Sequence, residues 1–314
     1  MRTPVSVGVV GPGPGALRLA RVFDDSPQAE VRWLSETRQL DVLLADESVD
    51  VVALATTSRG RVGLTRRALE AGKHAYVEGP LGASAREVEE LLAFADASNR
   101  RLMVGHALLF HPAVRKLKEL IELGRLGDVY YLTAVLQTGY GGCDGEDVVA
   151  ALGGEAVAVL LYLVADEPVR VQAATESYDR PGTAEVACGY LRFATGITAT
   201  VQLSSLDARE ACRFAAVGSR KTGVFDAGAA QALTIFERGS SRGAEIVSPR
   251  LPADDALRVE CECFLTGVRS AAEFPGARLE PAVARVVEAL AGEPADAPAR
   301  PGRPHLRLAL PTRK

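Results

Sequence analysis

Long apolar runs and basic runs are both missing from this 314-residue chain. No stretch approaches the roughly 18 consecutive apolar residues of a membrane-spanning helix, and the opening residues enter a β-branched segment without a signal-peptide core. The formal net charge is −4, and Lys and Arg do not cluster as they do on surfaces that bind nucleic acid or anionic membranes. We therefore expect a cytoplasmic protein that handles a small-molecule substrate and binds neither nucleic acid nor membrane.

Cysteine is scarce and scattered. Five cysteines, an odd number, fit a reducing compartment better than a disulfide framework. Cys261 and Cys263 are separated by one residue, which is too short for a zinc knuckle, and no histidine lies near them in the sequence. We expect no metal site.

Two kinds of pattern divide the chain. In residues 1–111, short β-branched runs alternate with helical segments, which is typical of a Rossmann-like α/β domain with a parallel sheet. In residues 112–291, strands follow one another with turns between them, which predicts an α+β domain with a large, mostly antiparallel open sheet. Residues 292–314 are Pro-rich and are expected to form a C-terminal tail.

The first predicted strand, residues 5–10, leads through a glycine turn into a helix, the context in which a GxGxxG-type match is meaningful. Gly11 would supply the tight turn, Gly13 the close backbone approach to a pyrophosphate, and Ala16 the contact between helix and strand. Pro12 and Pro14 have no N–H to offer a phosphate. A turn that only connects strand to helix is therefore the alternative interpretation.

The second predicted strand is followed by Glu36, at the place where an acid accepts the adenosine ribose hydroxyls. Glu36 favours NAD over NADP, although Arg38 is placed to meet a 2′-phosphate. Thr56 and Glu78, at the carboxyl ends of two further strands, are also candidate cofactor-binding residues. Near them, Arg61 could hold an anion, but a surface arginine at a helix start is the commoner explanation.

Several stretches resemble the Gfo/Idh/MocA oxidoreductases, and especially their sugar-nucleotide 3-dehydrogenase branch. They are AGKHAYVEGPLG at residues 71–82, the pair Gly105-His106, the turn Phe110-His111-Pro112, and VLLYLVADEPVRV at residues 159–171. The resemblance covers nearly the whole chain to about Ala291. It implies an NAD(P)-binding Rossmann domain, hydride transfer on a sugar or similar polyol, and a homo-oligomer formed through the open sheet of the second domain.

The sequence departs from this family where the family's chemistry is done. The lysine of the family's Glu-Lys-Pro motif falls on Gly79, its histidine on Glu155, and its aspartate on Ala151. Family members also place another helix and strand after the position of Glu36, so we expect a shortened Rossmann domain. Of the five lysines, Lys73 is nearest in sequence, but it lies at the amino end of its strand, far from the expected site.

Glu155 is the first candidate for acid/base chemistry, because a carboxylate at the mouth of an apolar pocket can have a raised pKa. A solvated residue at a helix N-terminus is the equally weighted alternative. Tyr140 and Asp144, in a glycine-rich loop, could also supply a proton, although such loops are often merely mobile. His106 is a candidate beside the cofactor, whereas His111 is expected to make a structural hydrogen bond.

Three functions remain open from the sequence. The missing lysine and histidine favour a protein that binds a sugar-like molecule or biosynthetic intermediate between its domains and catalyses non-redox proton transfer, as a cyclase, lyase or isomerase does. An NAD(P)-dependent oxidoreductase of a sugar or nucleotide sugar, with relocated acid/base residues, is a close alternative. The third is a non-catalytic subunit that pairs with an active paralogue.

Overall fold

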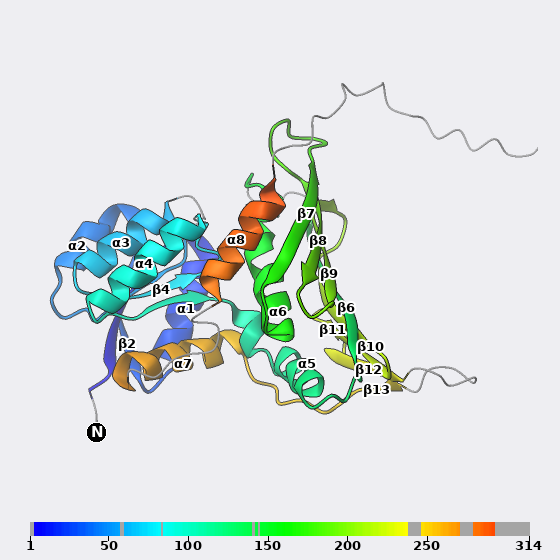
Figure 1. The fold of residues 1–314 in the computed structure, drawn as a ribbon. Helices are drawn as coiled ribbons and strands as arrows, with labels where there is room; N and C mark the ends of the chain where they lie inside the picture. The colour runs from blue at the N-terminus through cyan, green and yellow to red at the C-terminus, as the bar shows by residue number, and fades with distance from the viewer. Residues whose placement is uncertain are drawn as a thin grey trace, which may run out of the picture.

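The computed structural model describes residues 3–56, 60–82, 84–139, 142–143, 145–237, 246–270 and 279–292. They form a parallel α/β layer structure and, beside it, a large sheet covered by helices on one face (Figure 1). Both predicted fold classes, the Rossmann-like domain and the domain with a mostly antiparallel sheet, are confirmed.

The first sheet has five parallel strands in the order β2-β1-β3-β4-β5. Its strands are β1 (Val5–Val10), β2 (Ala29–Ser35), β3 (Val51–Leu54), β4 (His74–Glu78) and β5 (Leu102–Gly105). Every residue of β1 and β3 is buried, as expected for strands covered on both faces.

Four helices of this domain are α1 (Gly13–Asp24), α2 (Leu40–Ala45), α3 (Arg61–Glu70) and α4 (Ala85–Ala97). One apolar cluster joins α1 to one side of the sheet, and a second joins α2, α3 and α4 to the other. Helix α1 begins within the glycine turn, at Gly13, because Pro14 falls in the first turn, where a missing N–H costs nothing. Between β2 and β3 the chain forms only the short turn η1 (Thr37–Gln39) and α2.

The second sheet has the order β13-β12-β11-β10-β6-β9-β8-β7, in which only β6 and β9 pair in parallel. The strands are β6 (Val129–Gly139), β7 (Pro168–Glu176), β8 (Val186–Phe193), β9 (Thr198–Asp207), β10 (Ala211–Gly218), β11 (Lys221–Asp226), β12 (Leu233–Glu237) and β13 (Ile246–Val247).

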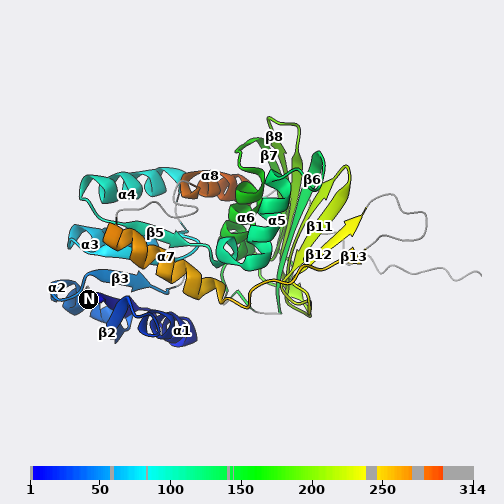
Figure 2. The ribbon, with the colours of Figure 1, turned by 90° about the horizontal axis from the view of Figure 1, so that it is seen from below.

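Helices α5 (Pro112–Glu122) and α6 (Gly154–Val164) cover one face of this sheet, and no helix of the described chain covers the other (Figures 1 and 2). Along β8, Leu191 and Phe193 face the helices and are buried, whereas Cys188 and Tyr190 point to the open face and are exposed. This alternation with a period of two is typical of a strand in a sheet with one covered face.

The last two helices return to the first domain. Helix α7 (Ala256–Ser270) packs against α1 and the turn η2 (Ala107–Phe110), and α8 (Glu280–Ala291) lies between α4 and α6 (Figure 1). Arg285 of α8 binds Glu89 of α4, and Glu288 accepts a hydrogen bond from the backbone N–H of Ala85. The C-terminal helices therefore hold the two domains together; the predicted domain boundaries stay predictions.

Candidate active site between the domains

Four predicted site residues lie at one edge of the parallel sheet. Gly11, Thr56, Glu78 and His106 stand at or just after the carboxyl ends of β1, β3, β4 and β5, which run in the same direction. The carboxyl edge is where ligands bind in open α/β sheets.

The glycine turn after β1 has the geometry predicted for it. A Cβ on Gly11 would lie 1.9 Å from the carbonyl oxygen of Ala55 and 3.3 Å from the Cβ of Ala16, so only glycine fits there. Gly13 has a φ of +72°, and no heavy atom lies within 4 Å of the position its Cβ would take. The start of α1 thus combines a turn that requires glycine with open space beside the backbone.

The described residues fit a dinucleotide in part. The Thr56 hydroxyl is buried, and no described group forms a hydrogen bond with it, so a ligand hydroxyl or amide would satisfy it. Gly13 and Gly15 keep N–H groups in the first turn of α1, although Pro12 and Pro14 have none. Glu36 is exposed, and its carboxylate lies 3.0 Å from the Nε of Arg38.

Arg61 corrects an expectation from the sequence. Its guanidinium is buried rather than on the surface, and its Nε donates to the carbonyl oxygen of Thr56 at 2.7 Å while Nη1 donates to that of Pro80. Burial lowers the pKa of Arg61, and the nearby carboxylates of Glu78 and Glu146 oppose that effect. Arg61 therefore stabilises the chain at the ends of β3 and β4 through hydrogen bonds to the backbone, and does not serve as an anion-binding side chain.

No side chain fits at Gly79 without movement of the backbone. A Cβ there would lie 2.2 Å from the carbonyl oxygen of Gly105 and 3.4 Å from Cε1 of His106. At the position that carries lysine in the Glu-Lys-Pro motif, the backbone at the end of β4 therefore lies too close to the end of β5 to leave space for a side chain.

His106 lies between two carboxylates from different helices. Its Nδ1 is 3.3 Å from Oε2 of Glu155 in α6, and its Nε2 is 2.8 Å from Oε2 of Glu280 in α8. Burial disfavours the imidazolium, but Glu280 and Glu155 outweigh burial and raise the pKa of His106 to about 10. At neutral pH the ring is therefore a cation that donates to both carboxylates.

A third carboxylate approaches the same residue from α7. Oε1 of Glu260 accepts the backbone N–H of His106 at 2.6 Å, and its Oε2 accepts the hydroxyl of Tyr76 at 2.9 Å. Glu260 is fully buried, and burial raises the pKa of its carboxyl to about 7.

The structure brings Glu155 and His106, two of the predicted site residues, into contact. Oε1 of Glu155 also accepts the backbone N–H of Leu108 at 3.0 Å, while its side chain stays 26% exposed, so it is neither freely solvated nor sealed off. The expected structural role of His111 is confirmed, because its Nδ1 accepts the N–H of Ala113 at the start of α5. Tyr140 and Asp144 lie outside the described residues.

Lys73 is placed where the sequence put it, away from this site. Its Nζ donates to the carbonyl oxygens of Asp46 and Val49, each at 2.8 Å.

Neither Glu260 nor Glu280 was predicted from the sequence to be a site residue. Glu260 has a readable signal, because it lies on the apolar face of a helix with Leu257, Cys261 and Phe264, where a charge is unusual. Glu280 opens a helix before Pro281, which looks like an ordinary first-turn acid. Its contact with His106 joins positions far apart in sequence, and only the packing of α8 reveals it.

A recess opens beside Glu155. It has a volume of about 400 Å³ and is lined by Gln137 and Thr138 of β6, Leu152 of the π-helical turn Val149–Gly153, and Glu210 and Cys212 at β10, among others. Burial raises the pKa of the Cys212 thiol to about 12, and the charge of Glu155 adds to the effect.

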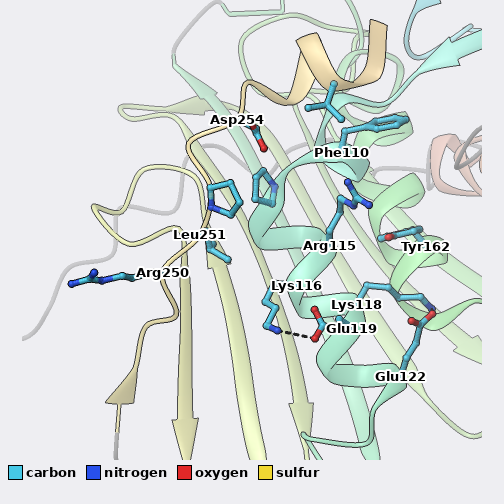
Figure 3. A pocket seen from close by; sticks show the side chains of 13 residues that line it. Phe110, Arg115, Lys116, Lys118, Glu119, Glu122, Tyr162, Arg250, Leu251 and Asp254 are labelled. Atoms are coloured by element: carbon cyan, nitrogen blue, oxygen red, sulfur yellow. Dashed lines mark hydrogen bonds and ion pairs between the residues drawn. The ribbon is translucent and has the colours of Figure 1, made fainter. Parts of the chain in front are cut away.

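A larger groove of about 610 Å³ runs along α5 (Figure 3). Arg115 lies beside Tyr162 there, and Arg250 stands on the segment at the far side. Its two lysines are already paired, Lys116 with Glu119 and Lys118 with Glu122. The smaller recess is the one with a lining residue, Cys212, whose thiol is influenced by the charge of Glu155.

The sequence matches two domain families in the same order as the two sheets. Residues 6–106 match the oxidoreductase family with an NAD-binding Rossmann fold, and residues 114–223 match the Gfo/Idh/MocA C-terminal domain. The chain belongs to the Gfo/Idh/MocA family.

Individual Gfo/Idh/MocA relatives are distant. UDP-N-acetylglucosamine 3-dehydrogenase from Acidithiobacillus ferrooxidans is 26% identical over 262 residues, which cover 80% of this chain and 81% of that protein. An uncharacterized oxidoreductase from Streptococcus pneumoniae is 30% identical over 142 residues, 40% of this chain and 39% of that protein. A mutant 3-ketoreductase from Actinomadura kijaniata, solved in complex with TDP-benzene and NADP, has a TM-score of 0.80 at 19% identity, covering 92% of this chain and 97% of that one.

Two features are absent from the described residues. No described helix is long and apolar enough to cross a membrane. In the same part of the chain, no group of three or more His, Cys, Asp or Glu side chains is arranged to hold a metal ion.

Proposed function

We propose that the chain is an NAD(P)-linked oxidoreductase of a sugar or nucleotide sugar, in which Glu155 takes the acid/base role that a lysine and a histidine have elsewhere in the family. The observation that carries this proposal is the contact between Glu155 and His106 at the carboxyl edge of a sheet whose glycine turn and unpaired Thr56 hydroxyl fit a dinucleotide. Membership of an oxidoreductase family and the sugar-nucleotide dehydrogenase among its relatives support this function over non-redox chemistry.

The nicotinamide, when bound, would accept or supply the hydride. Gly11, Gly13 and Ala16 would hold the pyrophosphate side, Glu36 the adenosine ribose, and Thr56 with Glu78 the part of the cofactor nearest the reaction. Exposed Glu36 beside Arg38 leaves both NAD and NADP as candidates, with NAD favoured.

The proton is moved by Glu155. Its Oε1 is held by the N–H of Leu108 and its Oε2 by the ring of His106, so the carboxylate has one fixed orientation and a partly exposed edge. It accepts the proton of a substrate hydroxyl as the carbinol carbon is oxidised, and returns it to the carbonyl oxygen in the reverse direction. The neighbouring recess offers Gln137 and Thr138 as hydrogen-bonding partners for other hydroxyls of a sugar.

The first test is calorimetric titration of the purified chain with NAD(H) and NADP(H), followed by hydride transfer with a panel of nucleotide sugars, read from the absorbance of the reduced cofactor. Glu155→Gln is expected to lower kcat by about 10²–10⁴ while cofactor affinity is unchanged, since only proton transfer is removed. Glu176→Gln, at an exposed position on β7, is the control and should keep full activity. An active Glu155→Gln variant would remove Glu155 from the mechanism.

One observation favours a second function, a non-redox proton-transfer enzyme of cyclase, lyase or isomerase type. The close approach at Gly79 leaves no space for the lysine that assists hydride transfer in the family. This function predicts that NAD(P) does not bind even at millimolar concentration. It also predicts a Glu155-dependent exchange of substrate protons, which is measured as deuterium incorporation. Loss of both activities would instead point to a non-catalytic subunit that pairs with an active paralogue.

A further inference from the structure

Glu280 makes the shorter of the two carboxylate contacts with the ring of His106. It lies on α8, far along the chain from both His106 and Glu155, and its side chain is 6% exposed. The burial of this carboxylate against an imidazole requires its own explanation.

The ring of His106 has two nitrogens, and each one faces a different carboxylate. Glu280 accepts from Nε2 at 2.8 Å, which leaves Nδ1 directed at Glu155 at 3.3 Å. A buried carboxylate at one nitrogen fixes the orientation of the ring and favours its doubly protonated form, and the other nitrogen then presents an N–H to its partner.

We propose that Glu280 is a positioning residue of the active site: it holds His106, and through His106 it holds the carboxylate of Glu155 toward the recess. This inference rests on the proposed role of Glu155 as acid/base. Glu280 itself touches no substrate. Its effect passes through one imidazole to the reacting carboxylate.

The other groups around His106 do not replace Glu280. Glu260 of α7 faces the backbone N–H of His106 and the hydroxyl of Tyr76 on β4, and neither of these contacts reaches the ring nitrogens. Among the described residues, Glu155, Glu280 and Glu260 form hydrogen bonds with His106, Tyr76 is linked to it through Glu260, and only Glu155 and Glu280 contact the ring nitrogens.

The test follows the imidazole directly. The chain has four histidines, so nitrogen-15 spectra of histidine-labelled protein resolve few signals, and His106→Gln identifies the one that belongs to residue 106. In Glu280→Gln the titration midpoint of His106 should fall by about 1–3 pH units, because an opposite charge in contact with the ring is lost. Unchanged signals from His74 and His111 show that the variant is folded.

Glu288→Gln is the matched control. Glu288 lies on the same helix and also bonds across the domains, to the N–H of Ala85, but it does not contact His106. This variant should leave the His106 titration where it is. An unchanged midpoint in Glu280→Gln, or an equal change in Glu288→Gln, would overturn the inference.

Turnover provides the second readout. With a substrate in hand, Glu280→Gln should lower kcat about 10–100-fold with little change in KM, the range typical of losing a group that orients a functional side chain. Glu280→Asp, which keeps the negative charge, should recover part of the lost kcat. A shifted titration with unchanged kcat would show a structural contact only. If no cofactor binds, the proposed oxidoreductase function is rejected. The titration of His106 then still tests whether Glu280 holds the imidazole.

Discussion

Pro80 and Gly154 lie in direct contact across the two domains: a Cβ on Gly154 would be placed 2.4 Å from the Cβ of Pro80. Gly154 is the first residue of α6, and Glu155 follows it. The absence of a side chain at Gly154 thus allows α6 to approach Pro80 of the first domain. This approach brings the carboxylate of Glu155 within reach of His106.

Gly154→Ala should force the two domains apart locally. We expect a loss of about 1–3 kcal/mol in the free energy of unfolding, the usual cost of overpacking, measured by urea denaturation. Gly63→Ala is the control, since Gly63 lies in α3 with no heavy atom within 4 Å of an added Cβ. That exchange should stabilise by up to about 1 kcal/mol, because alanine favours a helix. Equal stability changes in the two variants would contradict the contact.

Restoring the missing lysine should not restore the family's site. In Gly79→Lys the Cβ meets the carbonyl oxygen of Gly105 at 2.2 Å, so the ends of β4 and β5 must separate. We expect a loss of about 1–3 kcal/mol in unfolding free energy and no gain in turnover. Gly63→Lys, the same exchange at the open helical position, should stay within about 0.5 kcal/mol or stabilise. A stable Gly79→Lys enzyme with faster hydride transfer would show that the backbone adjusts freely.

The carboxylate of Glu185 should make stability depend on pH in the acid range. Burial alone would raise its pKa, but the backbone N–H groups of Tyr178, Asp179 and Arg180, with the Arg180 side chain, lower the pKa of Glu185 to about 2. A lowered pKa means that this stabilisation is complete above the unfolded value of 4.5 and is lost as the pH falls toward 2.

In Glu185→Gln the unfolding free energy should therefore vary less between about pH 4.5 and 2 than in the wild type, as measured by urea titrations at several pH values. Glu176→Gln, exposed at the neighbouring strand end, should keep the wild-type slope. A wild-type slope in Glu185→Gln would show that the three N–H contacts do not hold the carboxylate.

We propose that the open face of the second sheet pairs two copies of the chain. Tyr131 and Tyr190 stand on this face, 43% and 37% exposed, on strands whose opposite side packs on helices. Sedimentation should show a dimer, and Tyr131→Asp should convert it to a monomer by placing a charge in the contact. Leu123→Asp, 60% exposed after α5, should remain dimeric. A monomeric wild type would reject this pairing.

Much of the fold was predictable because its signals are local. The run Val5–Val10 has the predicted bounds, since β-branched runs and glycine turns act over a few residues. The prediction was wrong for Arg61, which looked like a surface residue but is buried against backbone carbonyls. Sequence spacing does not show what a long side chain meets after folding.

The sequence by itself determined the family, the two kinds of sheet and the loss of the lysine, because each of these is written in residue types and their order. Only the tertiary structure decided that Glu155, Glu260 and Glu280, from three different helices, converge on His106 at the end of β5. Packing brings Glu280 and Glu155 close enough to the imidazole to raise the pKa of His106, and such coupling depends on separation in space.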